Sequence, residues 1–113
     1  MSSRSRRRII VTGDWVELFD DERAASIWRI RWAEVDEIVA WKDDVWAYDI
    51  ICIGLRSGQK QYRCDEEQHG WHDLLRTIER LFAIRRDDWW RRVALPAFET
   101  SLTVIWRRGT PSG

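Results

Sequence analysis

The strongest constraint on the fold is an amphipathic segment at residues 66–82, EEQHGWHDLLRTIERLF. Its apolar residues recur with the period of an α-helix, so they share one helix face. They are Trp71, Leu74, Leu75, Ile78, Leu81 and Phe82. Asp65 is the predicted N-cap, and Gln68 completes a capping box with it. Because most of the preceding chain has strand patterns, we expect this helix to cover the apolar face of a sheet.

The first half of the chain predicts a β-hairpin and two further strands. Residues 9–11 and 15–19 flank the turn signal Thr12-Gly13-Asp14. Residues 26–32 (SIWRIRW) alternate, with arginines at every second position, so one face of this strand is expected in solvent. Residues 37–42 (EIVAWK) form the next strand, and Asp43 and Asp44 are expected to begin a loop.

The second half of the chain begins with a nearly continuous apolar run, YDIICIGL at residues 48–55, which predicts a central strand covered on both faces. After a turn at Ser57-Gly58, residues 59–64 (QKQYRC) return as a more polar edge strand. Beyond the long helix, residues 87–94 predict a short helix that ends before Pro96. Residues 101–106 (SLTVIW) are either a last strand or an extended arm.

Length and composition indicate one globular domain of 113 residues without net charge. We expect a disordered basic segment at residues 1–5, a single domain at 6–107 and a flexible tail at 108–113. Neither a signal peptide nor an apolar run of about 20 residues is recognised, and with two cysteines, Cys52 and Cys64, this predicts a cytoplasmic protein with reduced thiols. Nine tryptophans are many for one small core. Either some are exposed in a contact surface, or all take part in packing.

The order of strands and helices resembles an α+β, pleckstrin-homology-like (PH-like) antiparallel split barrel of about six to seven strands capped by a C-terminal helix. Five blocks together also resemble a family of small bacterial proteins: IRWAEVDEIVAWKDD, YDIICIGL, DEEQHGW, DWWRRVALPAF and TVIW. The similarity covers residues 8–106. Such proteins resemble the immunity-type partners of bacterial toxins, and the resemblance implies protein binding without catalysis.

Carboxylates lie where the apolar strand begins and just after its return strand ends, and they predict one candidate site. Because a turn at residues 57–58 returns the chain toward Asp49, the start of the long helix should lie at the same barrel end as the loop after residue 42. Clustered carboxylates there would bind a basic protein partner or a divalent cation, or they would only cap the helix. The predicted contact residues are Asp43, Asp44, Trp46, Asp49, Asp65, Glu66 and Glu67.

Arginines beside tryptophans around the short helix form an alternative site, for anionic lipid or nucleic acid. Its residues are Arg85, Arg86, Trp89, Arg91 and Arg92. The neutral chain argues against nucleic acid, and the short acidic turn Thr12-Gly13-Asp14 argues against binding a lipid head group at a membrane. His69 and His72 have helical spacing but no second ligand pair, so no metal or other cofactor is predicted. With no nucleophile or phosphate-binding motif recognised, we expect no enzyme. The oligomeric state stays open, with a homodimer among the alternatives.

Overall fold

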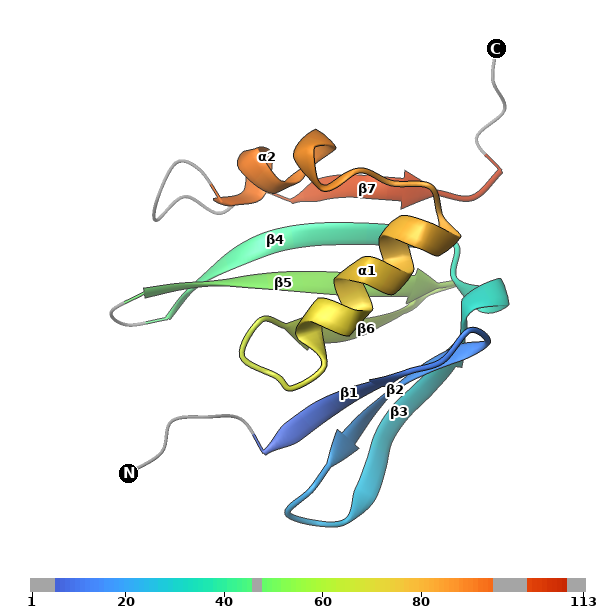
Figure 1. Cartoon of the computed structure of the whole chain (residues 1–113), viewed down its shortest axis with the longest axis vertical. Helices are drawn as coiled ribbons and strands as arrows, with labels where there is room; N and C mark the ends of the chain where they lie inside the picture. The colour runs from blue at the N-terminus through green and yellow to red at the C-terminus, as the bar shows by residue number, and fades with distance from the viewer. Residues whose placement is uncertain (1–5, 46–47, 95–101, 110–113) are drawn as a thin grey trace.

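The computed structural model describes residues 6–45, 48–94 and 102–109, which fold into an α+β structure (Figure 1). Its strands form two antiparallel sheets, with the orders β1-β2-β3 and β6-β5-β4-β7. The strands are β1 (Arg7–Val11), β2 (Trp15–Asp20), β3 (Ala25–Arg31), β4 (Glu37–Val45), β5 (Tyr48–Ser57), β6 (Lys60–Asp65) and β7 (Thr103–Arg107). The helices are α1 (Trp71–Leu81) and α2 (Trp90–Ala94), with 3-10 turns η1 (Trp32–Glu34) and η2 (Arg86–Asp88). None of these helices is long and apolar enough to cross a bilayer.

The two sheets do not close into a barrel within the described residues. The short turn η1 links β3 to β4. At a second seam, the backbone N–H of Ile9 in β1 donates a hydrogen bond of 2.6 Å to the carbonyl oxygen of His69, just before α1. A third contact joins the rings of Trp28 in β3 and Tyr62 in β6, whose centroids are 5.2 Å apart. The predicted α+β class is confirmed, whereas a closed barrel is not formed.

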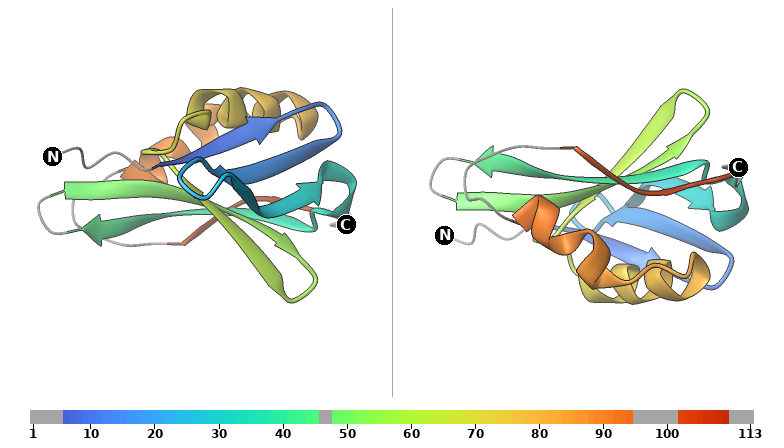
Figure 2. Two further views of the ribbon diagram at one scale, coloured as in Figure 1. Left: turned by 90° about the horizontal axis from the view of Figure 1, so that it is seen from below. Right: turned by 90° about the horizontal axis from the view of Figure 1, so that it is seen from above.

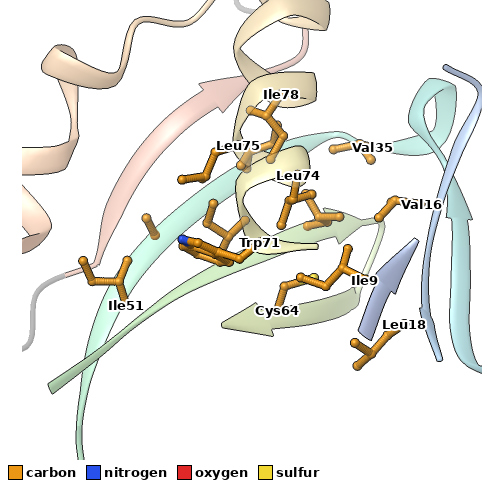
Figure 3. Close-up of a cluster of buried hydrophobic side chains, with 14 of the residues drawn as sticks. Ile9, Val16, Leu18, Val35, Ile51, Cys64, Trp71, Leu74, Leu75 and Ile78 are labelled. Carbon is orange, nitrogen blue, oxygen red and sulfur yellow. The ribbon is translucent and has the colours of Figure 1, made fainter. Parts of the chain in front are cut away.

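Helix α1 covers the core, as the sequence predicted (Figure 3). Trp71, Leu74, Leu75 and Ile78 are buried in one cluster with side chains from both sheets. The prediction was wrong for Leu81, which is 41% exposed at the end of the helix. Phe82, the next residue, packs its ring against Trp32 and Trp106, at centroid distances of 5.9 and 4.4 Å.

The helix begins five residues later than the predicted N-cap suggested. Asp65 and Gln68 form only one of the two bonds of a capping box: the N–H of Asp65 donates to Gln68 Oε1 (3.1 Å), whereas the N–H of Gln68 donates to the main-chain carbonyl of Asp65 (3.2 Å) and not to its side chain. These bonds close a separate turn, however, and Gly70 is the actual N-cap, with φ +91°. A Cβ at Gly70 would collide with the carbonyl oxygen of Ile9, so tertiary contact with β1 decides where α1 starts.

The hairpin of β4 and β5 is longer than predicted, and the expected loop at residues 43–44 was wrong. Asp43 and Asp44 belong to β4, where they pair with Ile50 and Asp49. The ladder of nine residue pairs continues to the pair of Val45 and Tyr48, and this long pairing outweighs the low strand propensity of aspartate. The central position of β5 and the edge position of β6 are confirmed. Residues 103–107 form the strand β7 beside β4.

The cysteine and tryptophan predictions have clear outcomes in the described part of the chain. Cys52 and Cys64 are both free and buried. Cys64 pairs with Ile53 and not with Cys52, so the two thiols lie on opposite faces of the sheet.

Apart from Trp46, which lies outside the described residues, the tryptophans are buried or half-buried. Packing therefore accounts for most of their surface.

Candidate functional site on the outer face of the sheet

Both helices lie on one side of the four-stranded sheet, and no described element covers the opposite side (Figure 2). We call this opposite side the outer face. Because side chains alternate along a strand, the odd-numbered residues from 37 to 43 in β4 point to it while Ile38 and Ala40 enter the core. The strand register arranges the outer face in four rows. The rows are Asp43 and Ile50; Trp41, Cys52 and Asp65; Val104, Val39, Gly54 and Arg63; and Arg107, Glu37, Arg56 and Gln61.

The middle of the outer face is apolar and is paved by one indole ring. Trp41 lies across Gly54, where an added Cβ would be only 2.9 Å from the ring carbon Cζ3. Val39 and Cys52 are fully buried, yet neither belongs to the core cluster under α1. Val104, at the β7 edge, is 41% exposed. A half-buried tryptophan beside an exposed valine on one face of a sheet is typical of a protein contact.

An acidic triad of Asp43, Arg63 and Asp65 lies at one end of this surface. The Arg63 guanidinium is 3.1 Å from Asp43 Oδ2 and 2.9 Å from Asp65 Oδ2. Asp43 Oδ1 also accepts a hydrogen bond of 2.9 Å from the indole N–H of Trp41. Two carboxylates around one guanidinium leave one negative charge, and the bonds fix its position.

The thiol of Cys52 lies beneath the acidic triad. Its Sγ is 3.5 Å from Asp43 Oδ2 and 3.2 Å from an Arg63 nitrogen. Burial raises the pKa of Cys52 to about 12, and the nearby carboxylate of Asp43 adds to this, while Arg63 opposes it. The thiol is therefore neutral at pH 7, which is the opposite of what a nucleophile needs.

A basic triad of Glu37, Arg56 and Arg107 lies at the other end. Arg56 is 2.7 Å from one Glu37 carboxylate oxygen, and Arg107 is 2.6 Å from the other. The hydrogen bond from Arg107, followed by that from Arg56, lowers the pKa of Glu37. Two guanidinium groups around one carboxylate leave one positive charge. The outer face therefore carries opposite charges at its two ends.

The other predicted acidic residues do not all join this site. Asp49 lies on the opposite face of the sheet, where its Oδ2 is 3.5 Å from Nζ of the buried Lys42. Glu66 directly follows Asp65 in the sequence, but its carboxylate accepts a hydrogen bond of 2.8 Å from the N–H of Ile51. Glu67 is half-buried beside it. Trp46 and the side chain of Asp44 lie outside the described residues.

The alternative arginine site lacks the exposed Trp89 ring that stacking on a ligand would require. Trp89 is only 3% exposed and belongs to the core, so its ring cannot stack on a ligand. Arg86 is paired with Glu79 at 2.9 Å. Arg85, Arg91 and Arg92 are exposed around α2. Sequence spacing alone could not separate a core tryptophan from a surface tryptophan in so short a helix.

No group of three potential metal ligands converges anywhere in residues 6–45, 48–94 and 102–109. His69 and His72 are both exposed, and the carbonyl of His69 is bonded to β1. Two hollows, one lined by residues 6–7 and 20–27 and the other by residues 66–72, are open and lined mainly by polar side chains. They do not have the enclosed shape that binds small molecules.

No protein-family model, curated protein or solved structure matches this chain. The resemblance to immunity-type proteins therefore stays a prediction.

Sequence reasoning missed several residues of the outer face, above all Arg63, Glu37, Arg56 and Arg107. The alternation of Glu37, Val39, Trp41 and Asp43 in one strand was the available signal. Read with period two to its full length, it assigns all four side chains to one face. The partners from β5, β6 and β7 follow only from the register.

Proposed function

We propose that this chain is a non-catalytic protein-interaction module whose outer face contacts a basic protein partner. The observation that carries the proposal is the acidic triad beside Trp41, on a face without a covering element in the described chain. Tryptophan and arginine are the residue types that most often dominate binding energy at protein contacts. Asp43 and Asp65 are held in fixed geometry by Arg63, and preorganised charges of this kind favour specific association.

A narrower form of the proposal is an immunity-type inhibitor, which would neutralise a basic surface of a toxin. Its support is the sequence resemblance together with the acidic end of the outer face. PH-like architecture is likewise a proposal, supported by two antiparallel sheets with an amphipathic helix between them. The opposite charge of the basic triad would set the orientation of the partner.

The test compares two variants that remove the same charge from different sides. Asp43→Asn alters the acidic triad, whereas Asp73→Asn alters an exposed aspartate on α1, paired with Arg76 at 2.6 Å. Immobilised wild type and both variants are used to capture proteins from a cell lysate of the source organism at low salt, with quantitative mass spectrometry. We expect wild type and Asp73→Asn to capture the same basic protein, and Asp43→Asn to capture less of it.

The binding constant of the captured protein is then measured. Asp43→Asn should weaken it by about tenfold, which is the effect of losing a charge-assisted contact, and Asp73→Asn should change it less than twofold. Equal capture by all three proteins would overturn the proposal. For the immunity-type form, the purified product of the adjacent gene is the probe, and a failure of wild type to bind it would overturn that form alone.

A further inference from the structure

The outer face is complementary to itself, because its two charged ends are opposite in sign and its centre is apolar. We propose that a second copy of this chain docks on the outer face. This inference rests on the proposed function, which makes this face a protein contact. The two sheets stack face to face around a two-fold axis. This axis lies between the two stacked sheets and runs parallel to them. It is at right angles to β4 and level with Ala40.

The strand register defines what this symmetry brings together. The axis lies midway between the row of Trp41 and the row of Val39, so each of these rows covers the other in the second copy. Trp41 then meets the valine row of the second copy, which includes the exposed Val104. In the same pair of rows, Asp65 of one copy lies over Arg63 of the other, and Arg63 over Asp65.

The outer rows are matched in the same way. The row of Asp43 covers the row of Glu37, Arg56 and Arg107 in the second copy, because both lie equally far from the axis. Asp43 lies over Glu37 of the second copy, and because Arg56 and Arg107 flank that carboxylate, the row that faces Asp43 carries one positive charge in total. Rotation about an axis parallel to the strands would instead bring Asp43 over Asp43, so charge selects the antiparallel stacking. Aligned packing of two sheets is a common arrangement.

The size of the surface sets the strength of this contact. Four strands are about 20 Å wide, and the four rows with their side chains are about 25 Å long. Two such faces bury on the order of 1,000 Å², which is near the lower limit for a specific interface. We therefore expect association in the micromolar range, weakened by salt because the charges are partly exposed.

The experiment is sedimentation equilibrium of the full chain at about 10 to 500 µM, at low and high salt. Wild type should form a dimer that dissociates more readily in high salt. Asp43→Lys makes both ends of the face positive, and Arg107→Glu makes both ends negative. Each variant alone should dimerise at least about tenfold more weakly, because like charges face each other. An equimolar mixture of the two should restore the dimer, because every contact is again between opposite charges.

Controls separate this proposal from general destabilisation. Asp73→Lys on α1 should dimerise like wild type, and circular dichroism should show that each variant is folded. The side chain of Arg107 is 60% exposed, so Arg107→Glu is expected to fold even if Asp43→Lys does not. If Arg107→Glu alone dimerises as strongly as wild type, the proposal is overturned.

Three results would overturn the proposed dimer: a monomeric wild type at the highest concentration in low salt, dimers that persist in both variants, or a mixture that stays monomeric. Failure of the proposed function has a different signature. A monomeric wild type that captures a partner through Asp43 refutes only the dimer. A dimer with the expected mutational pattern that captures no other protein refutes only the basic partner.

Discussion

Replacing Gly70 by alanine tests the seam that joins the two sheets. Gly70 is the N-cap of α1 and has φ +91° and ψ 0°. The preceding residue, His69, accepts a hydrogen bond of 2.6 Å from the N–H of Ile9. A methyl group at Gly70 would collide with the Ile9 carbonyl oxygen and would lie 3.2 Å from its Cβ. Alanine therefore requires either β1 or the start of α1 to move.

The magnitude has two parts. Left-handed backbone costs a residue with a Cβ about 1 kcal/mol relative to glycine. Forcing a methyl group into a packed contact costs a further 1–3 kcal/mol, roughly, because the obstacle is backbone and cannot rotate away. We expect Gly70→Ala to lower the free energy of unfolding by about 2–4 kcal/mol. For a domain of this size that is a fall in melting temperature of roughly 8–16 °C.

Two other glycines separate the backbone cost of positive φ from the cost of the steric contact. Gly58 also has positive φ, +60°, but an added Cβ would meet no atom within 4 Å, so Gly58→Ala should cost only about 1 kcal/mol. Gly13 has neither feature, and Gly13→Ala should be neutral or stabilise by up to about 1 kcal/mol. Urea denaturation followed by circular dichroism measures all three. If Gly70→Ala and Gly58→Ala differ by less than about 0.5 kcal/mol, the contact between Gly70 and β1 does not have the geometry described.

Three further predictions concern other parts of the fold. Lys42 is only 2% exposed and donates to the Ala94 carbonyl at 3.0 Å, so Lys42→Ala should destabilise by about 3–5 kcal/mol in urea denaturation by leaving the Asp49 carboxylate without this cation. Ala83 has φ +53° directly after the end of α1, so Ala83→Gly should raise the unfolding free energy by about 0.5 kcal/mol, as a melting curve would show. The pKa of Cys52, raised to about 12, lies above its unfolded value, so the contribution of this thiol to stability should be constant below pH 8 and fall as the pH rises from about 9 toward 12. Cys52→Ala should reduce this loss in denaturation at pH 7 to 11, and an unchanged pH profile would contradict the assignment.

Local pattern predicted most of the elements, for identifiable reasons. The period of the segment around Leu74 and Leu75 was unambiguous, because burial on one helix face leaves a spacing that no strand shares. The alternation of residues 26–32 was equally informative. The boundary at Gly70 and the length of β4 were not, since each depends on a contact with a distant segment. Ile9 is 61 residues before Gly70, and no local signal reports it.

The candidate site was predictable in part. Asp43 and Asp65 were both predicted, and the structure brings them together at Arg63. Asp49 was grouped with them because position along a strand was considered without the face of the sheet. A shift of one residue changes the face, so Asp49 lies on the helix side with Lys42.

The sequence by itself determined the class of the fold, the covering role of the long helix and the presence of more tryptophan than a small core usually holds. These properties follow from local periodicity and composition, which act between near neighbours. Only the tertiary structure decided which charges face each other, because the register of β4 with β5 and β7, and of β5 with β6, sets the rows of the outer face. That register places two carboxylates around Arg63 at one end and two guanidinium groups around Glu37 at the other. A chain without net charge thereby acquires a surface with oppositely charged ends, since net charge is a sum over residues while the field at a surface depends on their arrangement.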